Sequence, residues 1–330
     1  MKKLILCLIF VNLAFADNEA LLEKAKIFEE QGNYKEAMNI YKEIALQNQK
    51  VLQKPDLESQ NNRQVFAKQY IPFEDKETSE SVGQILSSEF GLYAYNTNYF
   101  APISYQNTQA NDRKKNEAKF QISVRKPISY NILGMDESIE FGYTQTSWWQ
   151  IYEKSGPFRE TNYSPEVFAL FLNKDHDSPL KAYKMGFIHT SNGQRGEESR
   201  SWNRLYVQGT YRIGNIFVTP TLWYRIPERA KKDPNDTYGD DNPDITTYYG
   251  FGELEIKYPY KQHIFDLKLR NNFRENNKNY VDFTWTFPFY TKSRLSKYFG
   301  YVNISSGYGD NLIDYQRYIN RVTLGVAFSR

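Results

Sequence analysis

The sequence predicts an all-β fold, a 12-stranded antiparallel transmembrane β-barrel preceded by a short N-terminal α-helical hairpin. From about Leu92 to the end of the 330-residue chain, apolar and polar residues alternate with the period of two that is typical of strands with one apolar and one polar face. The alternating segments run to about ten residues, a length that crosses a bilayer at a tilt, whereas strands of soluble proteins average nearer five or six. After the first sixteen residues no apolar run approaches eighteen residues, so any membrane crossing is expected to use strands.

Residues 1–16 are predicted to be a secretory signal peptide. Two lysines precede an apolar run over residues 4–13, and Ala14-Phe15-Ala16 forms a small-x-small cleavage site. The apolar run is too short to span a bilayer as a helix, so we expect cleavage after Ala16 and export from the cytoplasm. The single cysteine, Cys7, lies inside this signal, which excludes disulfides and a cysteine nucleophile in the mature chain. The formal charge of +3 is too small to indicate nucleic-acid binding.

Residues 17–48 are predicted to form a helical hairpin. Apolar residues recur at helical spacing on both sides of a Gly32-Asn33 break. They are Leu21, Leu22, Ala25 and Phe28 before it, and Tyr34, Ala37, Ile40, Tyr41 and Ile44 after it. The hairpin resembles a single tetratricopeptide repeat, which cannot bury its own apolar face, so a periplasmic partner and self-association both stay open. Residues 49–90 are polar and aperiodic and are expected to be a linker leading into the barrel of residues 91–330.

Twelve strand segments follow, and the even count is what bacterial barrels require. They lie near residues 92–105, 117–126, 137–149, 164–173, 180–191, 203–213, 215–226, 248–258, 262–272, 278–289, 296–306 and 316–328. Long polar segments at 192–202, 227–247 and 307–315 are expected to be outer loops, and the short connections at 214–215 and 259–261 periplasmic turns. The last strand alternates almost to the terminus and resembles the closing strand of outer-membrane barrels. Together with 27 Tyr and 22 Phe, which suit aromatic girdles, this predicts the outer membrane of a Gram-negative bacterium.

A polar segment at the outer end of two neighbouring strands carries the candidate chemistry. His189 and Ser191 are two residues apart on one strand and therefore share a face, and a simple hairpin register sets Asn203 opposite His189. Nucleophilic acyl transfer needs a hydroxyl, a base that takes its proton and a third group that fixes the tautomer of the base. Ser191, His189 and Asn203 can fill these roles. The spacing alone is equally compatible with a structural role, in which His189 belongs to an aromatic girdle.

The three polar residues are predicted to face lipid at the outer rim. The positions that share their parity are apolar; they are Tyr183, Met185 and Phe187 on the first strand and Leu205, Val207 and Tyr211 on the second. Polar groups on the bilayer face of a barrel cost free energy. A neutral trio at this place is therefore easier to explain as a device for acting on lipid than as structure.

The run from His189 to Arg204 resembles the signature of the outer-membrane phospholipase A family: His-x-Ser-Asn-Gly, five residues, then Ser-Arg-Ser-Trp-Asn-Arg. The likeness extends to residues 144–150, 157–163 and 308–315, and covers roughly residues 90–330. It implies a barrel that hydrolyses the acyl ester bonds of glycerophospholipids and lysophospholipids, as phospholipase A1 and A2, and that acts as a calcium-bound homodimer.

The resemblance also implies roles for single residues. Ser191 would be the nucleophile, His189 the base and Asn203 its orienting partner, and the backbone N–H of Gly193 would serve the oxyanion. Calcium would be held by the Ser199 hydroxyl, the Gln194 carbonyl and, across the dimer, Ser147.

The chain departs from the family in three places. Gln194 stands where the family often has Arg, and Gly196 where relatives can have an acidic residue that Glu197 or Glu198 would replace. The helical hairpin is not part of the family core. A non-enzymatic pore or adhesin on the same barrel is the alternative, suggested by the long outer loops and the polar inner face.

Overall fold

The computed structural model describes residues 21, 23–43, 92–108, 113–175, 177–233, 236, 239–289 and 298–330. The chain divides into two compact units, residues 1–90 and residues 91–330. The predicted signal peptide of residues 1–16 and the predicted linker of residues 49–90 lie outside the described residues.

The first unit contains the predicted helical hairpin. Its helices cover residues 21–30, with residue 22 outside the described set, and residues 34–43. Between them Gly32 has a φ of +74°, a left-handed conformation that glycine adopts without strain and that commonly ends helices. The side chains of Ala25 and Ala37 are buried, and the Tyr41 hydroxyl donates to Glu29 across the hairpin at 3.3 Å. In the described residues no helix is long and apolar enough to cross a membrane.

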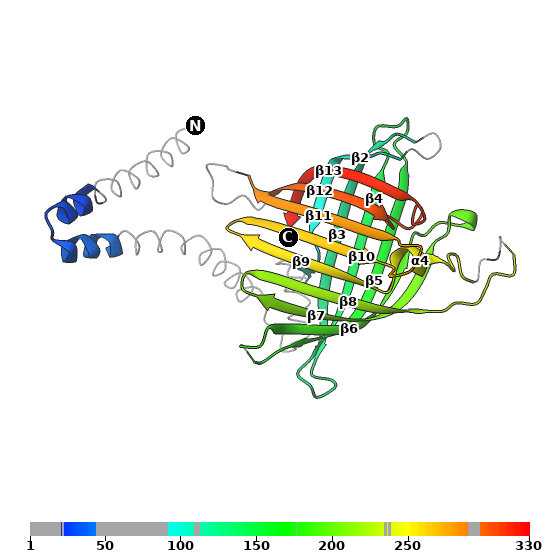
Figure 1. Ribbon diagram of the computed structural model, residues 1–330, viewed down its shortest axis with the longest axis horizontal. Helices are drawn as coiled ribbons and strands as arrows, with labels where there is room; N and C mark the ends of the chain where they lie inside the picture. The colour runs from blue at the N-terminus through cyan, green and yellow to red at the C-terminus, as the bar shows by residue number, and fades with distance from the viewer. Residues whose placement is uncertain are drawn as a thin grey trace, which may run out of the picture. The chain divides into compact units, whose positions relative to one another are not determined.

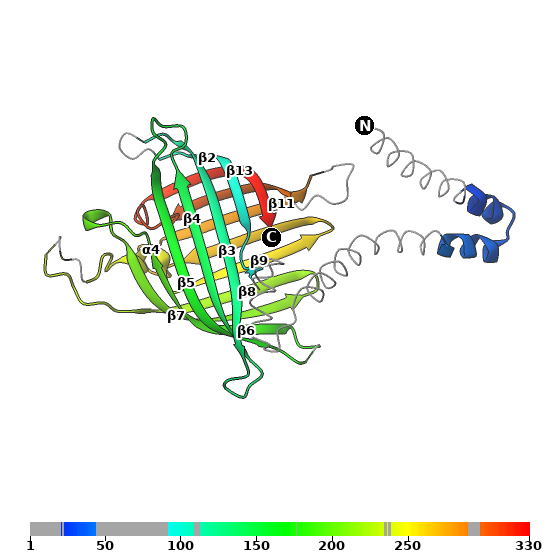
Figure 2. The same cartoon turned by 180° about the vertical axis from the view of Figure 1, so that it is seen from behind.

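The second unit is built from strands joined by loops and turns. The strands are β1 (Tyr93–Ala94), β2 (Asn98–Gln106), β3 (Asn116–Tyr130), β4 (Ser138–Trp149), β5 (Phe158–Leu172), β6 (Leu180–Ser191), β7 (Ser201–Ile213), β8 (Ile216–Ile226), β9 (Gly252–Tyr260), β10 (His263–Asn271), β11 (Asn279–Pro288), β12 (Phe299–Tyr308) and β13 (Tyr318–Ser329). Two short helices, η1 (Gly196–Glu198) and α4 (Ile245–Tyr249), lie in loops. Figure 1 looks onto the wall that contains β8 to β12, and Figure 2 onto the wall that contains β3 to β5.

Within the described part of the chain, strands β2 to β13 form a closed antiparallel barrel of twelve strands. Each strand pairs with the next along the chain, and β13 pairs with β2, which places Val322 opposite Tyr105. The two-residue β1 pairs with β3 just beyond the start of β2, so β1 and β2 together occupy the position of the first predicted strand. The predicted fold class is confirmed.

The strand predicted at 117–126 runs four residues further, to Tyr130, and two predicted strand starts were wrong by four residues or more. The strand predicted at 164–173 is β5, which begins six residues earlier, at Phe158. Its first residues carry polar side chains that point into the barrel, and these hide the apolar alternation from the sequence pattern. The strand predicted to begin at 248 begins at Gly252, since residues 245–249 form α4. The α4 residues Ile245 and Tyr249 pack with Trp202, Tyr206 and Trp223 in the apolar cluster of the barrel interior, which explains why a helix replaces the strand there.

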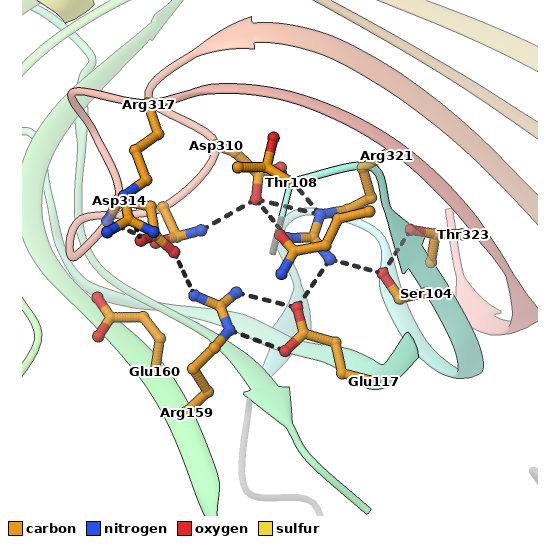
Figure 3. A network of polar contacts seen from close by, with 12 residues as sticks. Ser104, Thr108, Glu117, Arg159, Glu160, Asp310, Asp314, Arg317, Arg321 and Thr323 are labelled. Carbon is orange, nitrogen blue, oxygen red and sulfur yellow. Dashed lines mark hydrogen bonds and ion pairs between the residues drawn. The ribbon is translucent and has the colours of Figure 1, made fainter. Parts of the chain in front are cut away.

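A buried network of charged side chains lies inside the barrel (Figure 3). The Arg159 guanidinium donates to both carboxylate oxygens of Glu117, at 2.8 and 2.9 Å, and pairs with Asp314. Arg321 donates to Glu117 at 2.8 Å and to Asp310 at 2.8 Å, and its side chain is fully buried. These contacts connect the loop of residues 309–317 to strands β3, β5 and β13. The paired geometry is what makes such burial of charge tolerable.

Candidate active site

The register between β6 and β7 brings the predicted trio together. His189 lies directly opposite Asn203, and Ser191 lies opposite Ser201. The neighbour Trp202 is 1% exposed and points into the apolar interior cluster, so Asn203 points outward. Below the trio the same outer face carries exposed apolar side chains; Phe187, Met185, Leu205 and Val207 are all between 40 and 52% exposed. The structure therefore places the trio on the apolar outer face, at the end of the barrel where the long loops lie.

A short hydrogen bond joins His189 to Asn203. The distance from His189 Nδ1 to Asn203 Oδ1 is 2.8 Å. An amide oxygen can only accept, so Nδ1 carries the proton and donates it. The other ring nitrogen, Nε2, then carries the lone pair that can accept a proton from a hydroxyl. This tautomer is the one that a general base for Ser191 needs.

The turn after Ser191 is held by the buried Asn192. Its Nδ2 donates to the Glu198 carbonyl at 2.8 Å, and its Oδ1 accepts the backbone N–H of Arg200 at 2.9 Å. Gly193 follows with a φ of +67°, and a side chain there would meet the ring of Tyr163 at 3.3 Å. Glycine at 193 is thus required by the backbone conformation and by the close ring, which fixes the direction of the N–H groups that follow Ser191.

The predicted metal-binding residues lie in different environments. The Ser199 hydroxyl, at the end of the same loop, donates to Asp241 at 2.7 Å, and Asp241 also pairs with Lys231. Gln194 is exposed in the loop between β6 and β7. Ser147 on β4 is fully buried, and its hydroxyl oxygen accepts from Thr161 at 3.1 Å. The structure brings Gln194 and Ser199 into one loop and leaves Ser147 covered by its own chain.

The long loop between β8 and β9 contributes residues that the sequence did not reveal. Ile226, the last residue of β8, lies opposite Asn203, and two residues later Glu228 accepts from Asn203 Nδ2 at 3.0 Å. Burial, together with the charge of the nearby Asp240, raises the pKa of the Glu228 carboxyl. From the same loop the fully buried Asn242 accepts the backbone N–H of Ser201 at 2.9 Å. No motif or periodicity marks these residues, because they reach the site only through the β7–β8 pairing.

The barrel region is similar to proteins of known family. The family model described as Phospholipase A1 matches residues 76–328. Phospholipase A1 of Escherichia coli is 36% identical over 252 residues, which covers 72% of this chain and 81% of that protein.

The barrel region also matches solved structures. The outer membrane phospholipase A of Escherichia coli, as a variant with an active-site asparagine replaced by alanine, superposes with a TM-score of 0.64 at 33% identity and covers 72% of this chain and 92% of its own. The outer membrane phospholipase of Salmonella typhi, a dimer with bound calcium, superposes with a TM-score of 0.63 at 34% identity over the same shares of the two chains.

Proposed function

This chain belongs to the family of outer-membrane phospholipases A, and from that premise we propose that it hydrolyses phospholipid acyl esters through Ser191, His189 and Asn203. The family and the closed twelve-stranded barrel place the chain in the Gram-negative outer membrane. Both phospholipase A1 and A2 activities, on glycerophospholipids and lysophospholipids, are part of the proposal. The observation that carries it is the 2.8 Å bond from His189 to Asn203 on the lipid-facing surface.

The proposed reaction is acyl transfer to serine followed by hydrolysis. His189 Nε2 takes the hydroxyl proton as Ser191 Oγ attacks the ester carbonyl, and the same proton passes to the oxygen of the departing lysophospholipid or glycerol derivative. A water molecule then repeats the sequence on the acyl-serine and releases the fatty acid. Asn203 holds the imidazole in the required tautomer and accepts from Nδ1–H throughout.

The oxyanion formed on the carbonyl oxygen needs hydrogen-bond donors in place before the reaction. We propose the backbone N–H of Gly193, which the positive φ and the Asn192 contacts hold in one orientation. The place of the trio on the apolar face, next to the polar loops, supports this role, because the ester groups of a phospholipid lie between its apolar chains and its polar head group.

The donor chemistry near Ser199 fits a calcium ion. Calcium prefers oxygen ligands, and the loop offers the Ser199 hydroxyl and the Gln194 carbonyl. Because the Ser199 hydroxyl hydrogen is donated to Asp241, the lone pairs of its oxygen point away from that carboxylate and stay available to a cation. A bound calcium would supply positive charge beside the developing oxyanion. In the part of the chain that is described, no cluster of three or more His, Cys, Asp or Glu residues is arranged to hold a metal. The ligands that we propose, the Ser199 hydroxyl and the Gln194 carbonyl, are neutral oxygens.

We further propose that two copies associate, with support from the calcium-bound dimer of the Salmonella typhi relative. Ser147 can contribute to calcium across such a dimer only if Thr161 and Gln145 release its hydroxyl, since both donate to it and the residue is fully buried. The proposed calcium site therefore rests on Gln194 and Ser199.

The test is calcium-dependent release of fatty acid from phospholipid in detergent micelles, comparing the wild-type protein with Ser191→Ala. We expect the variant to lose at least about 10³-fold in kcat, because the nucleophile is removed and only binding and oxyanion stabilisation remain. Release at the same rate from both proteins would contradict the proposal. Chain-labelled substrates, with the label at either glycerol position, separate A1 from A2 activity.

A further inference from the structure

Glu228 lies where it can control the orientation of the Asn203 side chain. An amide group has two ends of nearly equal size, one that accepts and one that donates. If the amide of Asn203 turned over, its NH₂ would face the Nδ1–H of His189, two donors would oppose each other, and the base would lose the required tautomer. Asn203 is half-buried at the rim, so the choice between the two orientations depends on its second partner.

In its ionised form, that second partner can only accept. The Glu228 carboxylate receives Nδ2 of Asn203 at 3.0 Å, while Oδ1 of the same amide receives His189 at 2.8 Å. An ionised carboxylate has no hydrogen to donate to Oδ1. The reversed amide would therefore lose both hydrogen bonds, since it would set oxygen against oxygen at Glu228 and donor against donor at His189.

The loop around Glu228 is anchored on both sides, which makes it an effective positioning element. Asp240 donates its backbone N–H to the Arg229 carbonyl at 2.8 Å, and its side chain pairs with Arg225 at the end of β8. Both side chains of this pair are about 90% buried, at 11 and 10% exposure. Asn242 then connects the loop to the backbone of Ser201 at the start of β7. The segment that carries Glu228 is thus fixed to β8 and to β7, the strand that contains Asn203.

We propose that Glu228 is a positioning residue for hydrolysis, which acts by holding the Asn203 amide in the orientation that serves His189. The proposal rests on the Ser191, His189 and Asn203 mechanism described above. Glu228 itself does not contact the reacting atoms. It adds one hydrogen-bond acceptor, for the Asn203 amide, to the trio. This acceptor comes from the β8–β9 loop, which the spacing of the sequence motif does not include.

The experiment measures kcat and KM for fatty-acid release by the full-length protein with calcium in mixed micelles. Glu228→Ala removes the acceptor, and we expect kcat to fall about tenfold with KM unchanged, because one orienting hydrogen bond is lost while substrate contacts stay. Glu228→Gln keeps a carbonyl oxygen that can accept from Nδ2, so its kcat should lie closer to wild type than that of Glu228→Ala. Glu275→Ala removes an exposed carboxylate from another loop at the same end of the barrel and serves as the control, with unchanged kcat.

A second background separates orientation from a general structural effect. In Asn203→Asp the two terminal atoms of the side chain are both oxygens, so turning the carboxylate over changes nothing. In that background Glu228→Ala should therefore no longer lower kcat. Equal losses from Glu228→Ala in both backgrounds, or wild-type kcat in Glu228→Ala, would overturn the proposal. A difference in gel mobility between unheated and heated samples shows that the barrel of each variant is folded. An active Ser191→Ala would instead refute the proposed mechanism itself, and the two failures are therefore distinguishable.

Discussion

The buried Arg321 offers the most direct test of how the barrel tolerates its charged interior. Its side chain is fully buried and donates to Asp310 from Nε and Nη2, at 3.1 and 2.8 Å, and to Glu117 from Nη1 at 2.8 Å. Arg321→Met keeps the bulk of the side chain but removes the charge. Glu117 keeps both contacts from Arg159, whereas Asp310 loses its guanidinium partner.

Removing one partner of a buried ion pair costs roughly 3–5 kcal/mol, because the remaining charge stays away from water without compensation. We expect that loss in the free energy of unfolding at pH 7 for Arg321→Met. Arg317→Met is the matched control from the same network: Arg317 is 45% exposed and lies 3.6 Å from Asp314, so its loss should cost less than about 1 kcal/mol.

The pH dependence of the difference provides a second check. Burial alone would raise the pKa of the Asp310 carboxyl, but the charge of Arg321, with Lys119 and Arg159, outweighs it and holds that pKa well below its usual range. The wild-type contribution is therefore present above the ordinary aspartate pKa and is lost only as pH falls through the lowered one. In Arg321→Met burial dominates, the pKa of Asp310 rises, and protonation relieves the unpaired charge. The stability difference should shrink from pH 7 to about pH 5.

The assay is urea unfolding in detergent micelles, followed by tryptophan fluorescence and by gel mobility. Equal unfolding free energies for Arg321→Met and Arg317→Met would refute the argument that the buried pairing stabilises the barrel. A difference that did not change with pH would refute the assignment to Asp310.

Three further predictions concern calcium, the hairpin and the barrel interior. Chelation should abolish hydrolysis, and Ser199→Ala should raise the calcium concentration needed for half-maximal rate; full turnover in excess chelator would contradict the proposed cation site. Deletion of residues 17–48 should leave kcat of the purified protein within about twofold, since the family match begins at residue 76; lost activity would show that the hairpin belongs to the catalytic unit. Planar-bilayer recordings should show little conductance, because the Arg159 and Arg321 network occupies the interior, and steady porin-like currents would favour the pore alternative.

The alternation of side chains was enough to predict much of the barrel. Period-two patterning predicted twelve strands, the outward face of β6 and β7, and the pairing of His189 with Asn203, all of which the structure has. These features depend on local geometry, because a strand fixes which residues share a face and a short hairpin fixes which residues lie opposite each other. The predicted start of the strand at 248 was wrong, because residues 245–249 form α4, whose packing against Trp202 and Trp223 prevails over the local pattern.

What the sequence alone determined about this protein is therefore the barrel and the family to which the barrel region belongs, and it predicted the trio that we propose as catalytic. Only the tertiary structure decided that Ser147 is covered, that Ser199 donates to Asp241, and that Glu228 accepts from Asn203. The reason is sequence separation: Glu228 lies 25 residues beyond Asn203, in a loop whose path is set by the Arg225–Asp240 pair and not by any periodicity. Contacts of that kind exist only once the strands have closed and the loops have folded over the barrel end.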